Sequence, residues 1–437
     1  MRREEKSVKY DYSLYVLTDE KLMTTDTVEE SVRLALEGGA TMIQLREKTL
    51  DYNSFLKRAE AIKKITDAYD VPLIINDNVW IAKEVDAAGV HLGNEDMSLE
   101  EARSILGSDK IIGVSAHNLE EALNAQKAGV DYLGLGAMVA TSTKKEAKVM
   151  DFDILVSILN RIEIPCVIIG GISEENLSRW NGLKLSGIAV ISAVIGQEDI
   201  KEAANRMGHR FIHSPKISGV IFDLDGTLLD SNYLWRFIDQ MFLGKRGLQA
   251  NREYIQKMSG IGFYQGAVYT KEIFGLPESV EDILKEYFSM ALYEYSEKIN
   301  LKVGAIEVLK FLKEKKIPMA VATMNEERLF MPCLKRLGIL DYFDTIFSSN
   351  QVNTNKDHPE IYLKAARALG TLPKETAVLE DISVAANTAR KAGFLSVGVF
   401  DKNGAQKKEE LMSVSDIYLE NLLEIFPRIQ QIATVDK

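Results

Sequence analysis

The sequence is poor in cysteine and has no long apolar run, and each shortage excludes a class of protein. Only two cysteines, Cys166 and Cys333, occur among 437 residues. They exclude a disulfide framework and are typical of a reducing compartment, so we expect a cytoplasmic protein. No stretch reaches the roughly 18 to 20 apolar residues that a membrane helix needs. The charged N-terminus, MRREEKSVKYDYS, lacks the apolar core of a secretory signal.

An excess of positive charge is also missing. The net charge is −11, which argues against general nucleic-acid binding, because a phosphate backbone attracts basic surfaces. Small anionic substrates stay open, since a few local cations and helix N-termini suffice to hold a phosphate. The composition, 46% hydrophobic and 27% charged, is that of an ordinary globular protein. The length suggests two or three domains of about 150 residues each.

A unit of one apolar strand and one helical stretch repeats along residues 14–192. The expected strands are LYVLTD (14–19), MIQLRE (42–47), LIIND (73–77), GVHLG (89–93), IIGVSAH (111–117), YLGLG (132–136), CVIIGGI (166–172) and GIAVIS (187–192). Eight strands alternating with helices over about 200 residues predict a (β/α)8 TIM barrel. An open doubly wound sheet is the competing interpretation, and the count of eight favours the barrel.

Polar residues follow most of these expected strands, where barrel enzymes build their active sites. They are Gln44, Arg46 and Lys48; Asn76 and Asp77; His91, Gly93 and Asp96; Ser115 and His117; Thr141, Thr143 and Lys144; Gly170 and Gly171; and Ser192. Alternate residues of a strand face the same way, so we expect Gln44, Arg46 and Lys48 to point together into the barrel mouth. Cations buried there would need an anionic partner.

Six segments in this half occur in the order of a known motif series. QLREK, IINDN, GVHLGNED, GVSAH, TSTKKEA and VIIGGI resemble the motifs of thiamine phosphate synthase over about residues 12–207. The resemblance implies that a pyrimidine methyl diphosphate is joined to a thiazole phosphate, with release of pyrophosphate. Such chemistry needs cations and Mg²⁺ to neutralise the leaving diphosphate.

The family's functional residues carry over position by position. The resemblance implies that Arg46, Lys48, Asn76, Ser115 and Lys144 hold the diphosphate, that Asp77 and Asp96 bind Mg²⁺, that Gln44 contacts the pyrimidine, that Thr141, Thr143, Gly170, Gly171 and Ser192 take the thiazole phosphate, and that Ile191 also binds substrate.

One loop departs from the family pattern. GAMVATSTK (136–144) stands where the family has roughly G-P-x-[FY]-x-T-x-T-K. The threonines and the lysine remain, so we expect the function to survive, while loop rigidity and thiazole selectivity stay open. A thiazole tautomerase-type paralogue shares the fold without the reaction. The intact QLREK and ND segments favour the synthase.

A polar stretch separates the two halves of the chain. NRMGHRFIHSPKIS (205–218) contains Pro215 and has no clear period, which is typical of a linker. We therefore assign residues 1–207 to the barrel, 208–217 to a linker and 218–437 to a second domain.

A second motif series begins directly after this linker. In GVIFDLDGTLLDSN (219–232) an apolar strand leads into two aspartates, and MAVATMN (319–325), NKDHPEIYLKA (355–365) and TAVLEDISVAANTARKAG (376–393) follow. The series resembles the haloacid-dehalogenase-type phosphatases over about residues 217–430 and implies a Rossmann-like core. Residues 232–302 show helical spacing and predict the family's helical cap. Its aromatic side chains are expected either to stack on a substrate ring or to fill the cap's own core.

The resemblance also implies the chemistry of this half. Asp223 would be the nucleophile, Asp225 the acid and base, and Thr323 and Lys356 the phosphate-binding groups. One Mg²⁺ would be held by Asp223, the carbonyl of Asp225 and Asp381, with Glu380 orienting the metal's surroundings. With the barrel site, this gives one Mg²⁺ in each domain.

The two halves together predict a bifunctional enzyme of thiamine biosynthesis. The barrel would make thiamine phosphate, and the second domain would hydrolyse it to thiamine through an aspartyl phosphate. Three alternatives stay open: a phosphatase for another small phosphate, such as a pyrimidine, thiazole or sugar phosphate or a nucleotide; a sugar-phosphate mutase; and a half that binds phosphates without turnover. We expect small phosphorylated partners, no nucleic acid and no membrane. The sequence leaves open whether the protein forms a homo-oligomer.

Overall fold

The computed structural model describes residues 10–93, 95–140, 148–213, 215–258, 263–348, 356–404 and 406–429. The chain divides into two compact units, Met1–Ser214 and Pro215–Lys437. The segment 208–217, expected as a linker, holds the last three residues of helix α8 (Ile200–Arg210).

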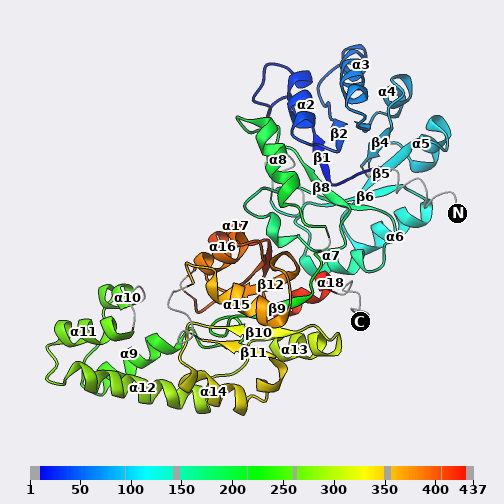
Figure 1. The fold of residues 1–437 in the computed structure, drawn as a ribbon. Helices are drawn as coiled ribbons and strands as arrows, with labels where there is room; N and C mark the ends of the chain where they lie inside the picture. The colour runs from blue at the N-terminus through cyan, green and yellow to red at the C-terminus, as the bar shows by residue number, and fades with distance from the viewer. Residues whose placement is uncertain are drawn as a thin grey trace. The chain divides into compact units, whose positions relative to one another are not determined.

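The first unit is a closed barrel of eight parallel strands in chain order, which confirms the predicted (β/α)8 fold (Figure 1). Its strands are β1 (Leu14–Leu17), β2 (Met42–Leu45), β3 (Leu73–Asn76), β4 (Gly89–Leu92), β5 (Ile111–Ala116), β6 (Tyr132–Gly136), β7 (Cys166–Ile169) and β8 (Gly187–Val190). The barrel closes where Leu14 pairs with Ile188.

Helices surround the barrel, one after each strand except β7. They are α2 (Val28–Glu37), α3 (Tyr52–Ala68), α4 (Val79–Glu84), α5 (Leu99–Leu106), α6 (Leu119–Ala128), α7 (Phe152–Leu159) and α8. Each begins after a Thr, Ser, Asp or Asn whose side chain accepts a hydrogen bond from a first-turn N–H, which satisfies a donor that the helix itself leaves unpaired. After β7 stands only the 3-10 turn η1 (Leu177–Arg179).

Apolar side chains fill both sides of the barrel wall. Inside lie residues such as Tyr15, Met42, Ile74 and Tyr132. Outside, strand residues such as Ile43 pack with the apolar faces of the helices. The strands are therefore buried on both faces, which is why they read as near-continuous apolar runs in the sequence.

The second unit is built on a six-stranded parallel sheet with the order β11-β10-β9-β12-β13-β14. The strands are β9 (Gly219–Phe222), β10 (Met319–Ala322), β11 (Thr345–Phe347), β12 (Thr376–Glu380), β13 (Leu395–Val399) and β14 (Ile417–Leu419). This order confirms the Rossmann-like core. It puts the carboxyl end of β9 between those of β10 and β12, where parallel α/β sheets bind their ligands.

Helices of the core flank this sheet. They are α13 (Ala305–Glu314), α14 (Glu327–Arg336), α15 (Glu360–Leu369), α16 (Ser383–Lys391), α17 (Lys408–Val414) and α18 (Phe426–Ile429), with the 3-10 turns η2 (Leu340–Tyr342), η4 (Pro373–Glu375) and η5 (Leu422–Ile425). Residues of α15 and α16 share one apolar cluster with β9, β10 and β12, so both helices cover the same face of the sheet.

Four helices form a cap between β9 and β10, as the sequence predicts for this region (Figure 1). They are α9 (Leu234–Gly244), α10 (Arg252–Met258), α11 (Phe263–Phe274) and α12 (Val280–Glu297). The chain thus leaves the sheet after Asp223, the candidate nucleophile, forms the cap, and later returns to the sheet at β10.

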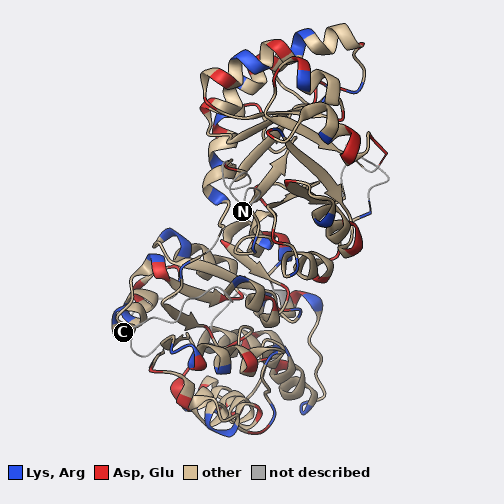
Figure 2. Ribbon diagram, turned by 90° about the vertical axis from the view of Figure 1, so that its right-hand side faces the viewer, with Lys and Arg blue, Asp and Glu red and all other residues tan. Residues whose placement is uncertain are grey.

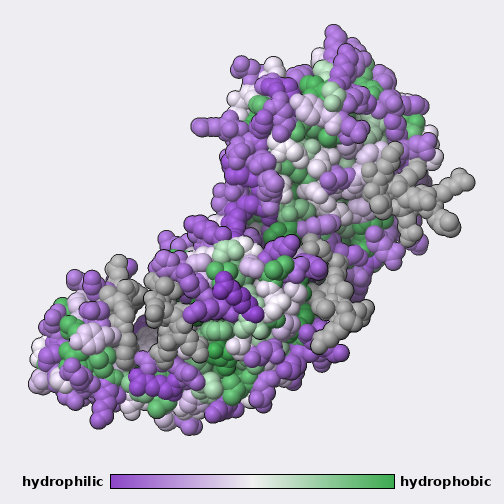
Figure 3. All heavy atoms as spheres, in the orientation of Figure 1, coloured by the Kyte–Doolittle hydropathy of each residue, from purple (hydrophilic) through white to green (hydrophobic). Residues whose placement is uncertain are grey.

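Charged residues lie mostly on the helices and loops, while the barrel strands carry few (Figure 2). Hydrophilic residues cover most of the visible face of each unit, with apolar ones scattered between them (Figure 3). None of the helices in the described ranges has the length and apolar character that crossing a bilayer requires.

Barrel closure should be sensitive to one glycine. A Cβ added at Gly187 in β8 would stand 1.7 Å from the backbone oxygen of Tyr12, so Gly187→Ala forces the backbone apart. We expect a loss of about 1–3 kcal/mol in unfolding free energy, measured by chemical denaturation. Gly208→Ala is the control, because the nearest atom to its added Cβ is a leucine methyl 3.8 Å away, and alanine favours the helix. Equal stability of the two variants would contradict the expectation.

Candidate functional sites

Three of the expected residues meet at the carboxyl ends of β2, β3 and β4. Lys48 forms an ion pair with Asp77, and Asp96 accepts a hydrogen bond from the backbone N–H of Gly93 at 2.6 Å. Burial, and then the nearby Asp77, raises the pKa of Asp96 above its ordinary value. Two carboxyl groups close enough to repel each other are a donor set that Mg²⁺ accepts.

The backbone at Asp77 is unusual in a way that fits a binding role. Its φ is 64°, in the left-handed region that residues other than glycine seldom adopt. Its backbone N–H donates to the carbonyl of His91 at 2.9 Å, which holds the turn in place. Such strain is found where a side chain must be aimed at a ligand.

Gln44 and Arg46, at the carboxyl end of β2, have partners on the neighbouring β1 segment. Arg46 Nη1 donates to Asp19 Oδ2 at 2.8 Å, so its anionic partner is a residue of the preceding strand end. Gln44 lies within β2 and is buried, and its Nε2 donates to Tyr15 OH at 2.7 Å inside the barrel. Gln44 therefore belongs to the floor of the site and Arg46 to its rim.

A chain of polar side chains crosses the barrel interior beneath these residues. Tyr15 OH lies 2.9 Å from Tyr132 OH, which lies 2.9 Å from His91 Nδ1, and His91 Nε2 lies 3.1 Å from Ser115 Oγ. Burial lowers the pKa of His91 to about 4, so the ring is neutral at physiological pH. The chain links Gln44 to Ser115, two expected substrate-binding residues, and fixes both.

Asn76 has a buried amide donor that could bind a ligand. It is the last residue of β3 and is buried, and its Nδ2 has no hydrogen-bond partner among the described residues. A buried amide donor is costly unless it is satisfied, and an anionic ligand would satisfy it. This observation fits the diphosphate that the sequence places here.

The other expected residues lie at the ends of β6, β7 and β8. Gly170 and Gly171 follow β7 with positive φ, and an added Cβ would come within 2.7 Å of Ala137 and Val139 respectively, so only glycine fits. Ile191 is partly buried, and Ser192 is exposed, directly after β8. Thr141, Thr143 and Lys144 lie outside the described residues.

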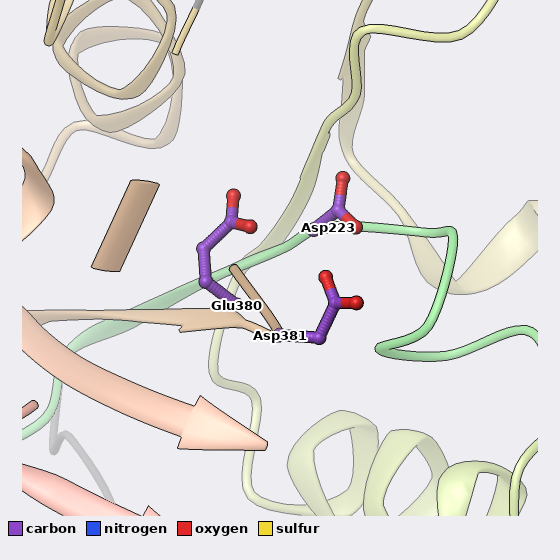
Figure 4. Close-up of side chains that lie close together, drawn as sticks. All are labelled: Asp223, Glu380 and Asp381. Atoms are coloured by element: carbon purple, nitrogen blue, oxygen red, sulfur yellow. The ribbon is translucent and has the colours of Figure 1, made fainter. Parts of the chain in front are cut away.

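In the second unit, the sheet brings the motif residues together. Asp223 follows β9, Thr323 follows β10, and Glu380 and Asp381 end and follow β12. The backbone N–H of Asp223 donates to the carbonyl of Leu379 at 3.0 Å, which aligns the two central strand ends. The carboxyl groups of Asp223, Glu380 and Asp381 lie within 4.8 Å of one another (Figure 4).

Lys356 is the cation within this cluster. Its Nζ pairs with Asp223 and also donates to Glu380 Oε1 at 2.6 Å, and Tyr362 OH donates to the same oxygen at 2.7 Å. Burial alone would lower the pKa of Lys356, but Asp223 and Glu380 raise it above the ordinary value, so the lysine is charged. One lysine against three buried carboxyl groups leaves an excess of negative charge.

The pKa values of the two aspartates reflect their burial and this excess of negative charge. Burial, opposed by Lys356 and helped by Glu380 and Asp381, raises the pKa of Asp223 well above its usual range. Burial and Glu380 raise the pKa of Asp381 to about 7. Asp381 Oδ1 and Glu380 Oε2 are buried and have no partner among the described residues. A divalent cation would satisfy both the charge and these oxygens, so the residues fit Mg²⁺.

Asp225 is held apart from this cluster by three neutral groups. Ser231 Oγ donates to its Oδ1 at 2.6 Å, Asn325 Nδ2 donates to its Oδ2 at 2.9 Å, and Tyr295 OH from cap helix α12 also donates to Oδ1. Three hydrogen-bond donors therefore fix the position of the Asp225 carboxyl group.

A cleft of about 490 Å³ opens between the cap and the core. Asp381 and Asn232 line its core side, while Trp235, Asp239 and Tyr287 line its cap side. Asn232 Nδ2 donates to Asp381 Oδ2 and to Asp401 Oδ2, both at 2.7 Å. The cleft therefore begins at the candidate metal ligands and ends among cap residues, as a pocket for a leaving group would.

The cap aromatics divide between the two expected roles. Tyr269 stacks on Tyr254 with ring centres 5.8 Å apart, which is a role in the cap's own core. Tyr233 packs edge-on against Phe237, and Tyr264 is exposed. Trp235 lines the cleft, so it is placed to meet a substrate. The side chain of Phe263 lies outside what the structure describes.

Several contacts of the sites have no local signal in the sequence. Tyr295 and Asp225 are 70 residues apart, and Asn232 and Asp401 are 169 apart. Asn325 stands two residues after Thr323 in the quoted MAVATMN segment, so that segment did carry a signal. Asp19, the partner of Arg46, ends the quoted LYVLTD strand in the same way.

Comparison with known families matches each half separately. The family described as thiamine monophosphate synthase matches residues 14–194, and the family described as haloacid dehalogenase-like hydrolase matches residues 220–399. A thiamine-phosphate synthase of Clostridium botulinum (strain Eklund 17B / Type B) is 47% identical over 203 residues, which cover 46% of this chain and 95% of that protein.

Solved structures match the two halves in the same way. A thiamine phosphate pyrophosphorylase from Pyrococcus furiosus is 40% identical and covers 46% of this chain and 95% of its own, with a TM-score of 0.42. A β-phosphoglucomutase from Clostridium difficile is 23% identical and covers 49% of this chain and 96% of its own, with a TM-score of 0.40.

Both families are enzymes that act on small phosphorylated compounds, and haloacid dehalogenase-like hydrolases typically use Mg²⁺, for which the acidic cluster around Asp223 is suited. The N-terminal half thus supplies a transferase domain and the C-terminal half a hydrolase domain. The chain belongs to the thiamine-phosphate synthase family through its barrel, and its second unit matches the family of haloacid dehalogenase-like hydrolases over residues 220–399.

Proposed function

We propose that the barrel makes thiamine phosphate and that the second unit hydrolyses this product to thiamine. The observation that carries the proposal is the joining of the two catalytic domains on one chain, each with its own cluster of phosphate-directed residues. A tethered phosphatase meets the barrel's product at a raised local concentration. Hydrolysis of the phosphate that the first domain forms is therefore the simplest use of the second.

In the barrel, cationic and amide groups stabilise the leaving diphosphate. Arg46, Lys48, Asn76, Ser115 and Lys144 hold it. Asp19 occupies one Nη1 of Arg46, and the guanidinium has further donors for the ligand. The thiazole nitrogen donates its lone pair to the pyrimidine methylene carbon as the C–O bond to the diphosphate breaks. No proton moves in this step, so no general base is needed.

The remaining barrel residues position the two reactants. Gln44 contacts the pyrimidine from the barrel floor, where Tyr15 fixes its amide. The thiazole phosphate lies against Gly170 and Gly171, with Ile191 and Ser192 beside it and Thr141 and Thr143 completing the site. Asp77 and Asp96 hold Mg²⁺, which neutralises charge on the departing diphosphate when it is bound.

In the second unit, an oxygen of Asp223 attacks the phosphorus, and the bond from phosphorus to the alcohol oxygen breaks. Asp225 gives its proton to that leaving oxygen. Water then gives a proton back to Asp225 as its oxygen attacks the aspartyl phosphate. Inorganic phosphate leaves, and Asp223 is restored.

The surrounding groups hold the phosphoryl group during both steps. Thr323 and Lys356 bind its oxygens, and Lys356 also offsets the charge of Glu380. Asp223, the carbonyl of Asp225 and Asp381 hold Mg²⁺, which offsets the charge of the transferring phosphoryl group when it is bound.

We also propose that the protein works in the cytoplasm. Cys166 and Cys333 are buried free thiols, which fits a reducing compartment. Whether the protein forms a homo-oligomer stays open.

Coupling should depend on Asp77. Asp77→Asn removes one charge from the expected Mg²⁺ site and weakens the ion pair with Lys48. We expect thiamine phosphate formation to fall by about 100-fold or more, since second ligands and partners of metal sites already contribute 10- to 100-fold. The assay follows products by chromatography from pyrimidine methyl diphosphate, thiazole phosphate and Mg²⁺. Asp67→Asn, an exposed helix carboxylate, is the control. Undiminished coupling in Asp77→Asn would refute the assigned role.

The second step should depend on Asp223. With the same substrates, the wild-type protein should convert thiamine phosphate onward to thiamine, while Asp223→Asn should accumulate thiamine phosphate, because the amide is a poor nucleophile. We expect at least about a 10³-fold loss of hydrolysis. Asp341→Asn, at an exposed turn of the same unit, should convert normally. Accumulation of thiamine phosphate by the wild type would assign the phosphatase to a different phosphomonoester.

A further inference from the structure

The cleft beside the phosphatase site holds a buried carboxyl group that the mechanism does not use. Asp239 lies on cap helix α9, is 8% exposed, and lines the cleft whose other end is formed by Asp381. Tyr254 OH donates to its Oδ1 at 3.3 Å, and Tyr287 also hydrogen-bonds to it. Its partners in the described part of the cap are thus neutral hydroxyl groups.

The charges around Asp239 leave it uncompensated. Tyr254 and Tyr287 face it from α10 and α12. Their own burial, together with the negative charge of Asp239, raises the pKa values of both tyrosines. Arg236 lines the same cleft but is exposed, and in the described ranges it forms no ion pair with Asp239. An exposed cation is screened by water, whereas a buried carboxylate is not. Burying such a charge without a cationic partner is costly.

The cost of burying this carboxyl group is reflected in its pKa. Burial raises the pKa of Asp239 to about 6, against an ordinary value of 3.8. It is still mostly ionised at neutral pH, so the cleft carries a negative charge in its inner wall. Trp235 and Tyr287 line the same wall, and aromatic rings also attract cations.

We propose that Asp239 recognises a positive charge in the leaving group of the phosphatase substrate. This inference rests on the proposed function and deepens it, because thiamine phosphate carries a cationic thiazolium ring. The cleft, at about 490 Å³, is within the range of sites for small molecules of this size. The phosphate would lie at Asp223 and Asp381, and the cationic ring between the core and Asp239. Asp239 is a specificity-determining residue in this arrangement, because it contacts no reacting atom.

The test compares ligands that differ only in charge. Phosphocholine and 3,3-dimethylbutyl phosphate have the same shape, with a quaternary nitrogen replaced by carbon, and thiamine phosphate and 3-deazathiamine phosphate form a second such pair. Binding is measured by calorimetry with Mg²⁺ on the full-length Asp223→Asn variant, which does not turn the esters over. The same titrations are repeated with Asp239→Asn added. Glu281→Gln, an exposed carboxylate at the start of α12, is the matched control.

We expect the cationic member of each pair to bind about tenfold more tightly than its neutral analogue. Asp239→Asn should remove this preference while leaving the neutral ligands within about twofold, and Glu281→Gln should keep it. Equal binding within both pairs, no binding of any of the four esters, or a preference that survives Asp239→Asn would overturn the inference.

This binding experiment and the hydrolysis assay of the wild-type protein together separate this inference from the proposed function. A preference for phosphocholine that depends on Asp239, in a protein that does not hydrolyse thiamine phosphate, would retain cation recognition and discard thiamine phosphate as substrate. Hydrolysis of thiamine phosphate without any charge preference would do the reverse.

Stability gives a second readout for Asp239. Its pKa in the folded protein lies above the ordinary value, so its favourable contribution is complete below about pH 4 and is lost as pH rises through about 6. Asp239→Asn should therefore raise the melting temperature of the second unit at about pH 8, by roughly 2–4 °C, and by about half as much at about pH 5, where part of the contribution is already lost. Differential scanning calorimetry measures both. A carboxylate kept only for packing would instead give a lower melting temperature at both pH values.

Discussion

The site of the second unit depends on a buried cluster of negative charge that one lysine cannot balance. Asp223, Glu380 and Asp381 are buried at the ends of two adjacent parallel strands, and Lys356 is the cation between them. The imbalance exists because the sheet order places β9 beside β12, so that Asp223 and Asp381, 158 positions apart in the chain, meet at one edge of the sheet. This excess of negative charge favours the binding of a cation, and with the cation a phosphate, at the site. Asp225, the proposed proton carrier, lies outside this cluster and accepts hydrogen bonds from neutral groups.

The barrel solves a related problem with pairs instead of a cluster. Arg46 and Lys48 each have their own aspartate, Asp19 and Asp77, so both cations are already paired. Below them, the neutral His91 and two tyrosines carry no charge into the interior. The proposed diphosphate would therefore have to rearrange these pairs, and the buried amide of Asn76 would offer it a donor.

Much of this could be predicted from the sequence, because the fold repeats a simple pattern and the motifs lie at strand ends. Eight apolar runs give the barrel, and the spacing from strand to Asp223, Thr323 and Asp381 gives the second site. The orientation of Gln44 could not be predicted in the same way. Spacing places it on one strand face with Arg46, but gives no sign that Gln44 bonds to Tyr15 within the barrel and that Arg46 pairs with Asp19. Tyr295, Asp401 and Asp239 act through contacts between distant segments, for which one sequence gives no pattern. The roles of Thr141, Thr143 and Lys144 stay predictions.

The linkage of two catalytic units in a single polypeptide fixes their numbers as well as their proximity. Every molecule synthesised carries one transferase centre and one hydrolase centre, so gene expression cannot change the ratio between them. The steady-state level of any shared intermediate is then set by the two turnover rates and by the supply of Mg²⁺ and substrates. The ratio of the two activities can therefore be changed by mutation of the chain, but not by changing how much of the protein is made.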